Sequence, residues 1–231
     1  MQHFDFETGE ILLINKPLSW TSFDVVKKVR NILRIKKIGH AGTLDPLAEG
    51  LLILCTGKYT KKIEAIQAQE KEYTGHFTLG QTTPSFDLET EVDTKKDYAY
   101  LTEEMIRETA RRFEGQIDQI PPLYSAVKIN GERAYTVARR GDTAEIKAKP
   151  ILIKAFEITE ITLPLVSFRV VCSKGTYIRS LARDFGEALG CGAHLSKLVR
   201  TRIGEFELSK ALSLTDIQNI RQQIMENASH S

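Results

Sequence analysis

The sequence has little cysteine, and its cysteines are not spaced as metal-ligand or redox pairs. Cys55, Cys172 and Cys191 form an odd set in a chain of 231 residues. This usage argues for free thiols in a reducing compartment rather than for a disulfide framework. The chain also lacks an apolar run of about 18 residues, which a transmembrane helix needs. We therefore expect a cytoplasmic protein without a membrane partner.

Two common nucleotide-binding motifs are missing as well. No G-x-G-x-x-G pattern occurs. Gly57-Lys58 is not part of a phosphate-binding P-loop, because Tyr59 follows it in place of Ser or Thr and no glycine stands five residues before Gly57. Cys191 and His194 form the closest Cys–His pair, and two ligands do not complete a zinc site. The sequence thus predicts chemistry that uses no metal and no nucleotide cofactor.

Charge is unevenly distributed, although the net charge is only +2 at pH 7. No acidic residue occurs between Val25 and Leu44. That stretch carries six basic residues, Lys27, Lys28, Arg30, Arg34, Lys36 and Lys37. Acidic residues instead crowd into residues 87–104. A concentrated basic segment suits a polyanion such as nucleic acid, although such a run is also typical of a solvated helix face.

A glycine-rich stretch, residues 39–50, follows this basic segment. It contains three glycines, His40, Asp45 and Pro46. Glycine lets a backbone approach a ligand closely or turn with positive φ, so we expect the loop to bring Asp45 to an anionic substrate. A carboxylate in that position needs a cation beside it, and we predict Arg179. Two structural alternatives remain: Asp45 as the N-cap of a helix that starts at Pro46, and His40 as an ordinary hydrogen-bonded loop residue.

Hydrophobic periodicity predicts the elements around this loop. Strands are expected over residues 10–15, 51–55, 71–79, 150–162, 166–173 and 203–208. Helices are expected after a cap at Thr21 or Ser22, and over residues 58–69, 102–114, 177–189 and 215–225, the last capped by Thr215. We expect an exposed loop over residues 81–98, a hairpin turn at Asn130-Gly131, and a helical turn over residues 135–140.

The order of these elements predicts the fold class. Strands and helices interleave irregularly, and the chain has too few strand–helix–strand units for a doubly wound sheet. We therefore expect an α+β fold with a mixed, mainly antiparallel central sheet flanked by helices.

Aromatic residues alternate with bases in the second half of the chain. Tyr124, Tyr135 and Tyr177 stand near Lys128, Arg133, Arg139 and Lys174. This composition suits the stacking of unpaired bases and the binding of phosphates. Tyr73 has two interpretations, a strand core residue or a stacking residue.

Several long segments resemble one known family. GHAGTLDPLAEGLL closely resembles the catalytic motif of the TruB family, the tRNA pseudouridine-55 synthases. Further matches are INKPLSWTS, KEYTGHFTLG, PPLYSAVKINGERAYTVARRG and VCSKGTYIRSLARDFGEALGCGAH, spread from about Leu12 to about Arg202. The resemblance implies a pseudouridine synthase fold, with one catalytic domain over residues 1–231. It also implies isomerisation of a uridine in the T loop of tRNA, flipped out of its loop, without a cofactor.

The resemblance also implies roles for individual residues. Asp45 would be the essential nucleophilic aspartate, Arg179 its ion-pair partner, and Tyr73 a residue that stacks on the flipped base and aids proton transfer. The other implied substrate contacts are His40 near the displaced uridine, Tyr177 and Leu198 along the uracil pocket, and Lys16, Lys128 and Arg139 as RNA contacts.

The resemblance has two departures. Many family members continue into a C-terminal PUA-type RNA-binding domain, for which a chain ending at Ser231 leaves no room. The acidic turn at residues 85–90 lacks the family's glycine, so no role is assigned to Asp87. We expect a monomer that binds the T arm of tRNA. The alternatives are an RNA-binding, tRNA-folding chaperone that uses the same pocket, and a guide-RNA-dependent synthase, which the absence of an appended domain disfavours.

Overall fold

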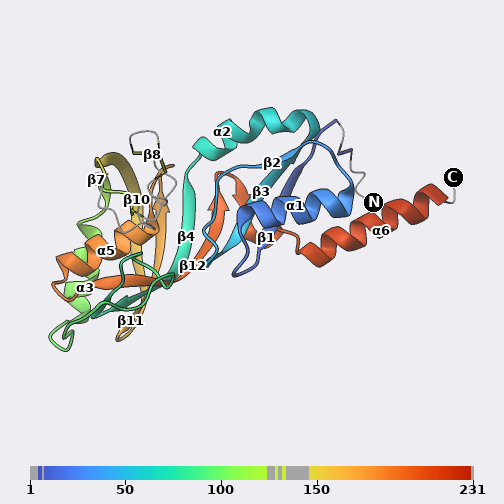
Figure 1. Cartoon of the computed structure of the whole chain (residues 1–231). Helices are drawn as coiled ribbons and strands as arrows, with labels where there is room; N and C mark the ends of the chain where they lie inside the picture. Colours follow the sequence, from blue (N-terminus) through green and yellow to red (C-terminus); the bar gives the residue numbers. More distant parts are fainter. Residues whose placement is uncertain (1–4, 7, 124–127, 130–131, 134–145, 230–231) are drawn as a thin grey trace. The chain divides into compact units, whose positions relative to one another are not determined.

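The computed structural model describes residues 5–6, 8–123, 128–129, 132–133 and 146–229 (Figure 1). The chain forms two compact units. Unit 1 comprises residues 1–72 and 199–231, and unit 2 comprises residues 73–198. In the part of the chain described, every helix is too short or too polar to span a bilayer.

Unit 1 combines strands with helices from both ends of the chain. Its strands are β1 (Ile11–Lys16), β2 (Ile38–His40), β3 (Ala48–Thr56), β13 (Phe206–Glu207) and the end of β12 (Ala193–Ile203). Its helices are α1 (Ser22–Leu33), η1 (Gly57–Lys62), α2 (Ile63–Ala68), η2 (Leu208–Lys210) and α6 (Leu214–Ser229). Strand β3 pairs antiparallel with both β1 and β2, and its other sheet neighbour is β12.

The continuous apolar run predicted as a buried strand forms part of β3, which is buried on both faces. Leu52 and Leu54 point into one core cluster, with α1 and the inner residues of β1. Leu51 and Ile53 point into a second cluster, together with Ile66 of α2. A strand buried on both faces has no polar alternation. The prediction of residues 51–55 is confirmed, and the strand begins three residues earlier.

The caps of two helices show how local chemistry fixes the chain. Thr21 caps α1 as predicted, because its hydroxyl accepts from the Asp24 N–H at 3.0 Å and Asp24 binds back to the Thr21 N–H. The predicted cap of the last helix, Thr215, is wrong. The Ser213 hydroxyl accepts from the Asp216 N–H at 3.1 Å, so α6 starts earlier.

Unit 2 is built on a sheet in the order β12-β4-β11-β10-β7. Its strands are β4 (Lys71–Leu79, which begins in unit 1), β7 (Gly115–Gln119), β10 (Lys149–Thr162) and β11 (Leu165–Cys172), and its helices are α3 (Glu103–Arg111) and α5 (Ile178–Ala188). Strand β10 pairs antiparallel with both β11 and β7. The core gathers phenylalanines, with the rings of Phe77 and Phe168 stacked at 4.2 Å between centroids. The mixed sheet with flanking helices confirms the predicted fold class.

Two short hairpins complete unit 2. Strand β8 (Lys128–Ile129) pairs antiparallel with β9 (Glu132–Arg133). This pairing is the one expected on either side of the predicted hairpin turn, whose residues Asn130 and Gly131 lie outside the described residues. Strand β5 (Gln81–Thr82) pairs with β6 (Thr94–Lys95). The exposed loop predicted for residues 81–98 is therefore wrong in part, because this hairpin encloses buried side chains.

Two strand predictions also need correction near the end of the chain. Strand β12, from Ala193 to Ile203, was not predicted. The strand expected over residues 203–208 is replaced by the end of β12, the two-residue β13 and the 3₁₀ turn η2. The tyrosines expected to stack on RNA, Tyr124 and Tyr135, and the helical turn over residues 135–140 lie outside the described residues.

Candidate active site

Asp45 lies in a turn between β2 and β3, not at the start of a helix. The Ala48 N–H donates to the Asp45 carbonyl at 3.0 Å, and β3 begins at Ala48. The interpretation of Asp45 as a helix N-cap is therefore wrong. The chain turns back at Pro46 because residues 50–55 pair antiparallel with β1, with Gly50 opposite Lys16. The Asp45 side chain is left half-buried beside a solvent-facing loop.

Glycine is required where this loop enters the strand. Gly50 has φ of +101°, which other residues rarely adopt. A Cβ atom at Gly50 would also lie 2.4 Å from the carbonyl oxygen of Arg200. The close approach of these two backbones fixes the exit of the Asp45 loop against β12.

A buried arginine on strand β12 binds the backbone of the Asp45 loop. Arg200, on β12, is 1% exposed. Its Nη2 donates to the Gly42 carbonyl at 3.0 Å, its Nε to the Leu51 carbonyl at 2.8 Å, and its Nη1 to the Thr43 carbonyl at 3.4 Å. The planar fork of a guanidinium suits several carbonyls at once. Arg200 therefore fixes both ends of the segment that carries Asp45.

Lys16 supports the same loop from the other side. Its side chain is fully buried, and its Nζ donates to the carbonyl oxygens of Trp20 at 2.6 Å, Pro17 at 2.9 Å and Pro46 at 3.4 Å. Burial lowers the pKa of Lys16 to about 8, against the opposing effect of the carboxylates of Glu49 and Asp45. The structure thus gives Lys16 a supporting position under the loop. Its predicted RNA contact stays a prediction.

The start of α1 is tied to the loop by direct hydrogen bonds. The buried Ser22 hydroxyl accepts from the Leu44 N–H at 2.9 Å and lies 3.1 Å from the Leu44 carbonyl, to which it donates. The Ser19 N–H donates to the Pro46 carbonyl at 2.8 Å. Residues on both sides of Asp45 are therefore anchored to the first helix.

His40 stands at the entrance of the same loop, as the last residue of β2. Its side chain is half-buried, and burial lowers the pKa of its imidazole, an effect that the Arg200 charge strengthens and a hydrogen bond with the Gly42 backbone opposes. His40 is consequently neutral at pH 7. Unit 1 thus brings three predicted site residues together: Asp45, His40 and Lys16.

Unit 2 holds a second group of predicted residues. Tyr73 lies on β4 and is 8% exposed, and Leu198 lies on β12 and is 9% exposed. The two strands run very close, because a Cβ at Gly75 would lie 2.0 Å from the Lys197 carbonyl oxygen. Tyr73 is thus part of the buried face of its strand, which confirms the predicted alternation. Its stacking role stays a prediction.

Arg179 forms a buried ion pair within unit 2. Its Nε lies 3.7 Å from Oδ2 of Asp87, and the side chains are 5% and 7% exposed. The Glu89 N–H donates to Oδ1 of Asp87 at 2.9 Å, which fixes the carboxylate in its turn. Asp87, which has no role assigned in the sequence analysis, is therefore the ion-pair partner of Arg179 within unit 2. The predicted pairing of Arg179 with Asp45 joins the two units and stays a prediction.

The helix that carries Arg179 is positioned by a buried amide. Gln119 is 1% exposed, and its Oε1 accepts from the Tyr177 N–H at 2.8 Å while its Nε2 donates to the Tyr177 carbonyl at 3.2 Å. Tyr177 is the N-cap residue of α5 and makes no side-chain cap. Gln119 therefore fixes the backbone two residues before Arg179.

The remaining predicted RNA contacts are described only in part. Lys128 lies on β8, and Arg139 lies outside the described residues. Sequence reasoning missed Arg200 and Gln119. The signal for Arg200 was indirect: a tight glycine-rich loop buries carbonyl groups that need donors. Among the residues described, no cluster of three or more His, Cys, Asp or Glu side chains is arranged to hold a metal.

Comparison with known proteins gives consistent results along the chain. Residues 30–178 match the model for the N-terminal domain of the TruB family of pseudouridylate synthases, and residues 179–230 match that of the tRNA pseudouridylate synthase B C-terminal domain. The tRNA pseudouridine synthase B of Flavobacterium johnsoniae is 53% identical over 218 residues, 91% of this chain and 95% of that protein. That of Parabacteroides distasonis is 53% identical over 225 residues, 95% of this chain and 96% of that protein.

Solved structures agree with these sequence matches. A Cbf5-Nop10-Gar1 complex contains a chain that is 32% identical, with a TM-score of 0.77, over 96% of this chain and 57% of that one. The archaeal box H/ACA sRNP Nop10-Cbf5 complex contains a chain that is 28% identical, with a TM-score of 0.72 and the same coverage. This chain thus spans little more than half the length of those structural relatives.

Proposed function

The chain belongs to the TruB family of pseudouridylate synthases, and on that premise we propose that it isomerises a uridine in the T loop of tRNA, position 55, to pseudouridine. The observation that carries the proposal is Asp45, held on a rigid turn by the buried cations Lys16 and Arg200. A carboxylate that must approach an anionic polymer needs positive charge close by. The enzyme would be an isomerase.

The reaction leaves the elemental composition of the substrate unchanged. The bond between ribose C1′ and uracil N1 breaks, the base turns, and a bond forms between C1′ and uracil C5. The proton on C5 leaves to solvent, and N1 gains one. Attack on the sugar, attack on the base, and elimination to a glycal all start from an ionised Asp45. The role of the carboxylate is therefore independent of which bond it forms first, and the balanced reaction requires no oxidant or nucleotide.

The target uridine lies inside a folded loop, so the base must leave its stack. Flipping costs a few kcal/mol, which stacking and pocket contacts recover. In this proposal Tyr73 stacks on the flipped base and aids proton transfer, while Tyr177 and Leu198 line the uracil pocket. Arg179, already paired with Asp87, turns its charge toward Asp45.

The remaining residues grip the RNA around the target. His40, neutral and half-buried at the loop entrance, enters the T loop near the displaced uridine. Lys128 and Arg139 contact the backbone. The partner is the T arm of tRNA, bound by a monomer in the cytoplasm. One catalytic domain over residues 1–231 remains part of the proposal.

Release of tritium tests the proposal. Purified protein is incubated with an unmodified tRNA transcript that carries tritium at uracil C5. Wild type is expected to release tritium, and Asp45→Asn, which keeps the shape but removes the charge, is expected to release none. A chaperone that uses the same pocket predicts the opposite: tRNA folding that survives in Asp45→Asn and no release from wild type.

A further inference from the structure

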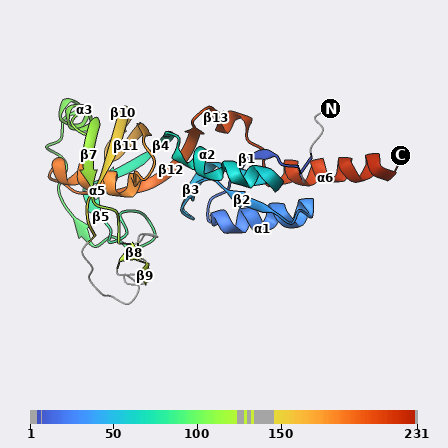
Figure 2. The ribbon, with the colours of Figure 1, turned by 90° about the horizontal axis from the view of Figure 1, so that it is seen from above.

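The outer face of α1 is an exposed surface beside the candidate site. The helix buries Val25, Val26 and Val29 against the unit 1 core. Figure 2 shows α1 lying on the outside of its unit, next to β2. The side chains on the other face of the helix line a hollow of about 340 Å³, formed by Ser19, Trp20, Asp24, Lys27, Lys28 and Asn31.

This face is basic and stays so along the helix. Lys27 and Lys28 are both exposed, and so is Arg34 just past the helix end. Asp24 is the acidic residue of the hollow, and its carboxylate accepts from the N–H and hydroxyl of Thr21 at 3.0 and 2.6 Å. Those bonds, which lower the Asp24 pKa, commit this charge to the helix cap. The charge of Lys27 also lowers the Asp24 pKa, and Lys27 and Lys28 together leave the hollow with a net positive charge that attracts an anion.

Apolar side chains stand exposed beside these bases. Phe23, in the first turn of α1, is 65% exposed, and Leu18, four residues before the helix, is 50% exposed. Trp20 is half-buried and lines the hollow. An exposed aromatic ring among lysines is the combination that holds a nucleic-acid strand, because the ring stacks on a base while the ammonium groups bind phosphates.

The surface is attached to the loop of Asp45. Ser22, in the first turn of α1, bonds both the N–H and the carbonyl of Leu44, and Ser19 bonds the carbonyl of Pro46. These contacts all lie within unit 1. From Phe23 to Arg34 the helix advances about 16 Å, the length of a few nucleotides. The first turn of α1 is therefore in contact with the residues on both sides of Asp45, and the basic face begins at that turn.

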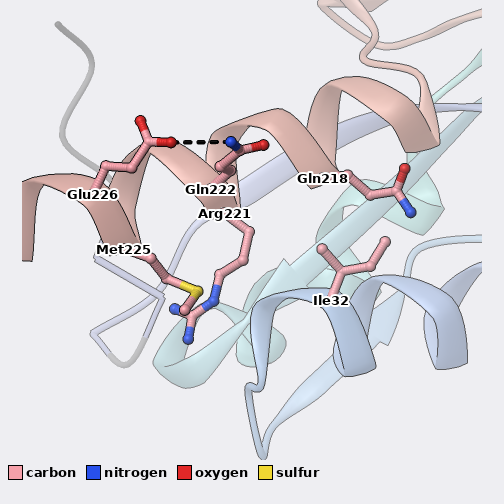
Figure 3. Close-up of a pocket in the computed structure, with 6 residues that line it drawn as sticks. All are labelled: Ile32, Gln218, Arg221, Gln222, Met225 and Glu226. Carbon is pink, nitrogen blue, oxygen red and sulfur yellow. Dashed lines mark hydrogen bonds between the residues drawn. The ribbon is translucent and has the colours of Figure 1, made fainter.

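A larger hollow in the same unit lacks these properties. It lies between α1 and α6, has a volume of about 460 Å³, and is lined by Ile32, Gln218, Arg221, Gln222, Met225 and Glu226 (Figure 3). Arg221 is the single cation among these six side chains, and Gln222 donates to Glu226 at 3.0 Å. Charge complementarity therefore selects the outer face of α1 over this groove.

We propose that the outer face of α1 binds the RNA strand that flanks the modified nucleotide, with Lys27 and Lys28 on phosphates and Phe23 stacked on an unpaired base. The proposal rests on the proposed function for the identity of the polymer. It adds a binding surface that lies outside the pocket for the flipped uridine.

The test compares two double variants in binding an unmodified tRNA transcript. Lys27→Gln/Lys28→Gln removes two charges from the surface. Lys58→Gln/Lys61→Gln removes two exposed lysines of η1 in the same unit and serves as the matched control. Dissociation constants are measured over a range of salt concentrations, and tritium release gives kcat and KM.

The surface variant is expected to bind about tenfold more weakly at low salt and to lower the salt slope by about 1.4 to 1.8, the loss of two phosphate contacts. Its KM rises and its kcat is unchanged, because neither lysine touches the reacting atoms. Phe23→Ser is expected to weaken binding at least about fivefold with no change of slope. The control keeps the wild-type constant and slope.

Two results would overturn the proposal. In the first, the surface variant keeps the wild-type dissociation constant and slope. In the second, the control loses as much as the surface variant, which would mean that only net charge matters. Failure of the proposed function looks different, since the wild type would then release no tritium while these binding measurements would still report on the surface.

Discussion

The guanidinium of Arg200 donates a hydrogen bond of 3.0 Å to the carbonyl oxygen of Gly42, across 158 residues of sequence. Glycine-rich loops expose backbone carbonyls, and buried carbonyls require donors. Arg200 supplies three from one side chain, to Gly42, Thr43 and Leu51. The turn that presents Asp45 is therefore held in place by a side chain of strand β12.

Replacement of this guanidinium is predicted to loosen the turn. Arg200→Lys keeps the charge but cannot reach all of its carbonyl partners, so the free energy of unfolding is expected to fall by about 2 kcal/mol. A looser Asp45 also lowers kcat more than it changes KM. Chemical denaturation and tritium release measure both. Arg169→Lys, at an exposed ion pair with Glu157, is the control and should change stability by less than about 1 kcal/mol; equal losses in the two variants would contradict this account.

The lowered pKa of Lys16 makes the free energy of unfolding depend on pH in the alkaline range. Its pKa is lowered from 10.5 to about 8 in the folded protein. Between these values the unfolded chain binds the proton and the folded chain does not, so unfolding takes up a proton and the free energy of unfolding rises with pH. The slope is at most about 1.4 kcal/mol per pH unit. Below pH 8 both states are protonated, and the slope from this group vanishes.

The comparison with Lys16→Met isolates this effect, because other titrating groups cancel in the difference. The free energy of unfolding of wild type, minus that of the variant, is expected to rise steadily from pH 8 to pH 10. Denaturant unfolding at several pH values measures it. Parallel curves for the two proteins would show that Lys16 is protonated normally in the folded state.

Gln119 is predicted to matter through the backbone that it holds. Gln119→Met leaves the N–H and carbonyl of Tyr177 without these partners. A buried polar group that loses its partner costs about 1–3 kcal/mol, and displacement of α5 should raise KM as well. Gln116→Met, on the exposed face of the same strand β7, is the control. Equal thermal unfolding midpoints for the two variants would show that the hydrogen bonds of Gln119 to Tyr177 do not stabilise the fold.

The ion pair between Asp87 and Arg179 predicts that Asp87 helps to orient Arg179, although the sequence analysis assigns no role to Asp87. Asp87→Asn keeps an oxygen for the Glu89 N–H but removes the charge that faces Arg179. The orientation of Arg179 then weakens, and kcat is expected to fall by about tenfold, equivalent to about 1.4 kcal/mol. Single-turnover tritium release measures the chemical step. Glu91→Gln, at an exposed position in the same segment, is the control and should retain the wild-type rate. A wild-type rate for Asp87→Asn would show that Asp87 has no part in catalysis.

The sequence predicted elements whose local and long-range preferences agree. Thr21 caps α1, the residues of β4 alternate between buried and half-buried, and Leu51 to Cys55 are buried on both faces of their strand. In each case the periodicity that signals the element is the same one that buries it. Asp45 was predicted from its glycine-rich loop and Arg179 from the need for a cation beside it, whereas a role of Tyr73 on the flipped base is implied only by the resemblance to the family.

What could not be predicted depends on partners distant in sequence. An Asp-Pro pair favours a helix start, yet Asp45 lies in a turn, since Gly50 and its neighbours pair with β1. Lys16 and Arg200 are charged residues that a pattern places on the surface, and both are buried because loop carbonyls surround them. Strand β12 follows a turn at Gly190 and Gly192, which have positive φ, but its place in the sheet between β3 and β4 depends on partners distant in sequence. Such placements follow from tertiary packing, which local periodicity does not contain.

The most direct test of the central claim maps pseudouridine along a tRNA transcript at single-nucleotide resolution after incubation with purified protein. Three proteins are compared: wild type, Asp45→Asn, and Asp118→Asn as the same substitution at an exposed site. The account predicts one pseudouridine, in the T loop, for wild type and Asp118→Asn and none for Asp45→Asn. Pseudouridine formed by Asp45→Asn at the wild-type rate, or formed by wild type only outside the T loop, would contradict it.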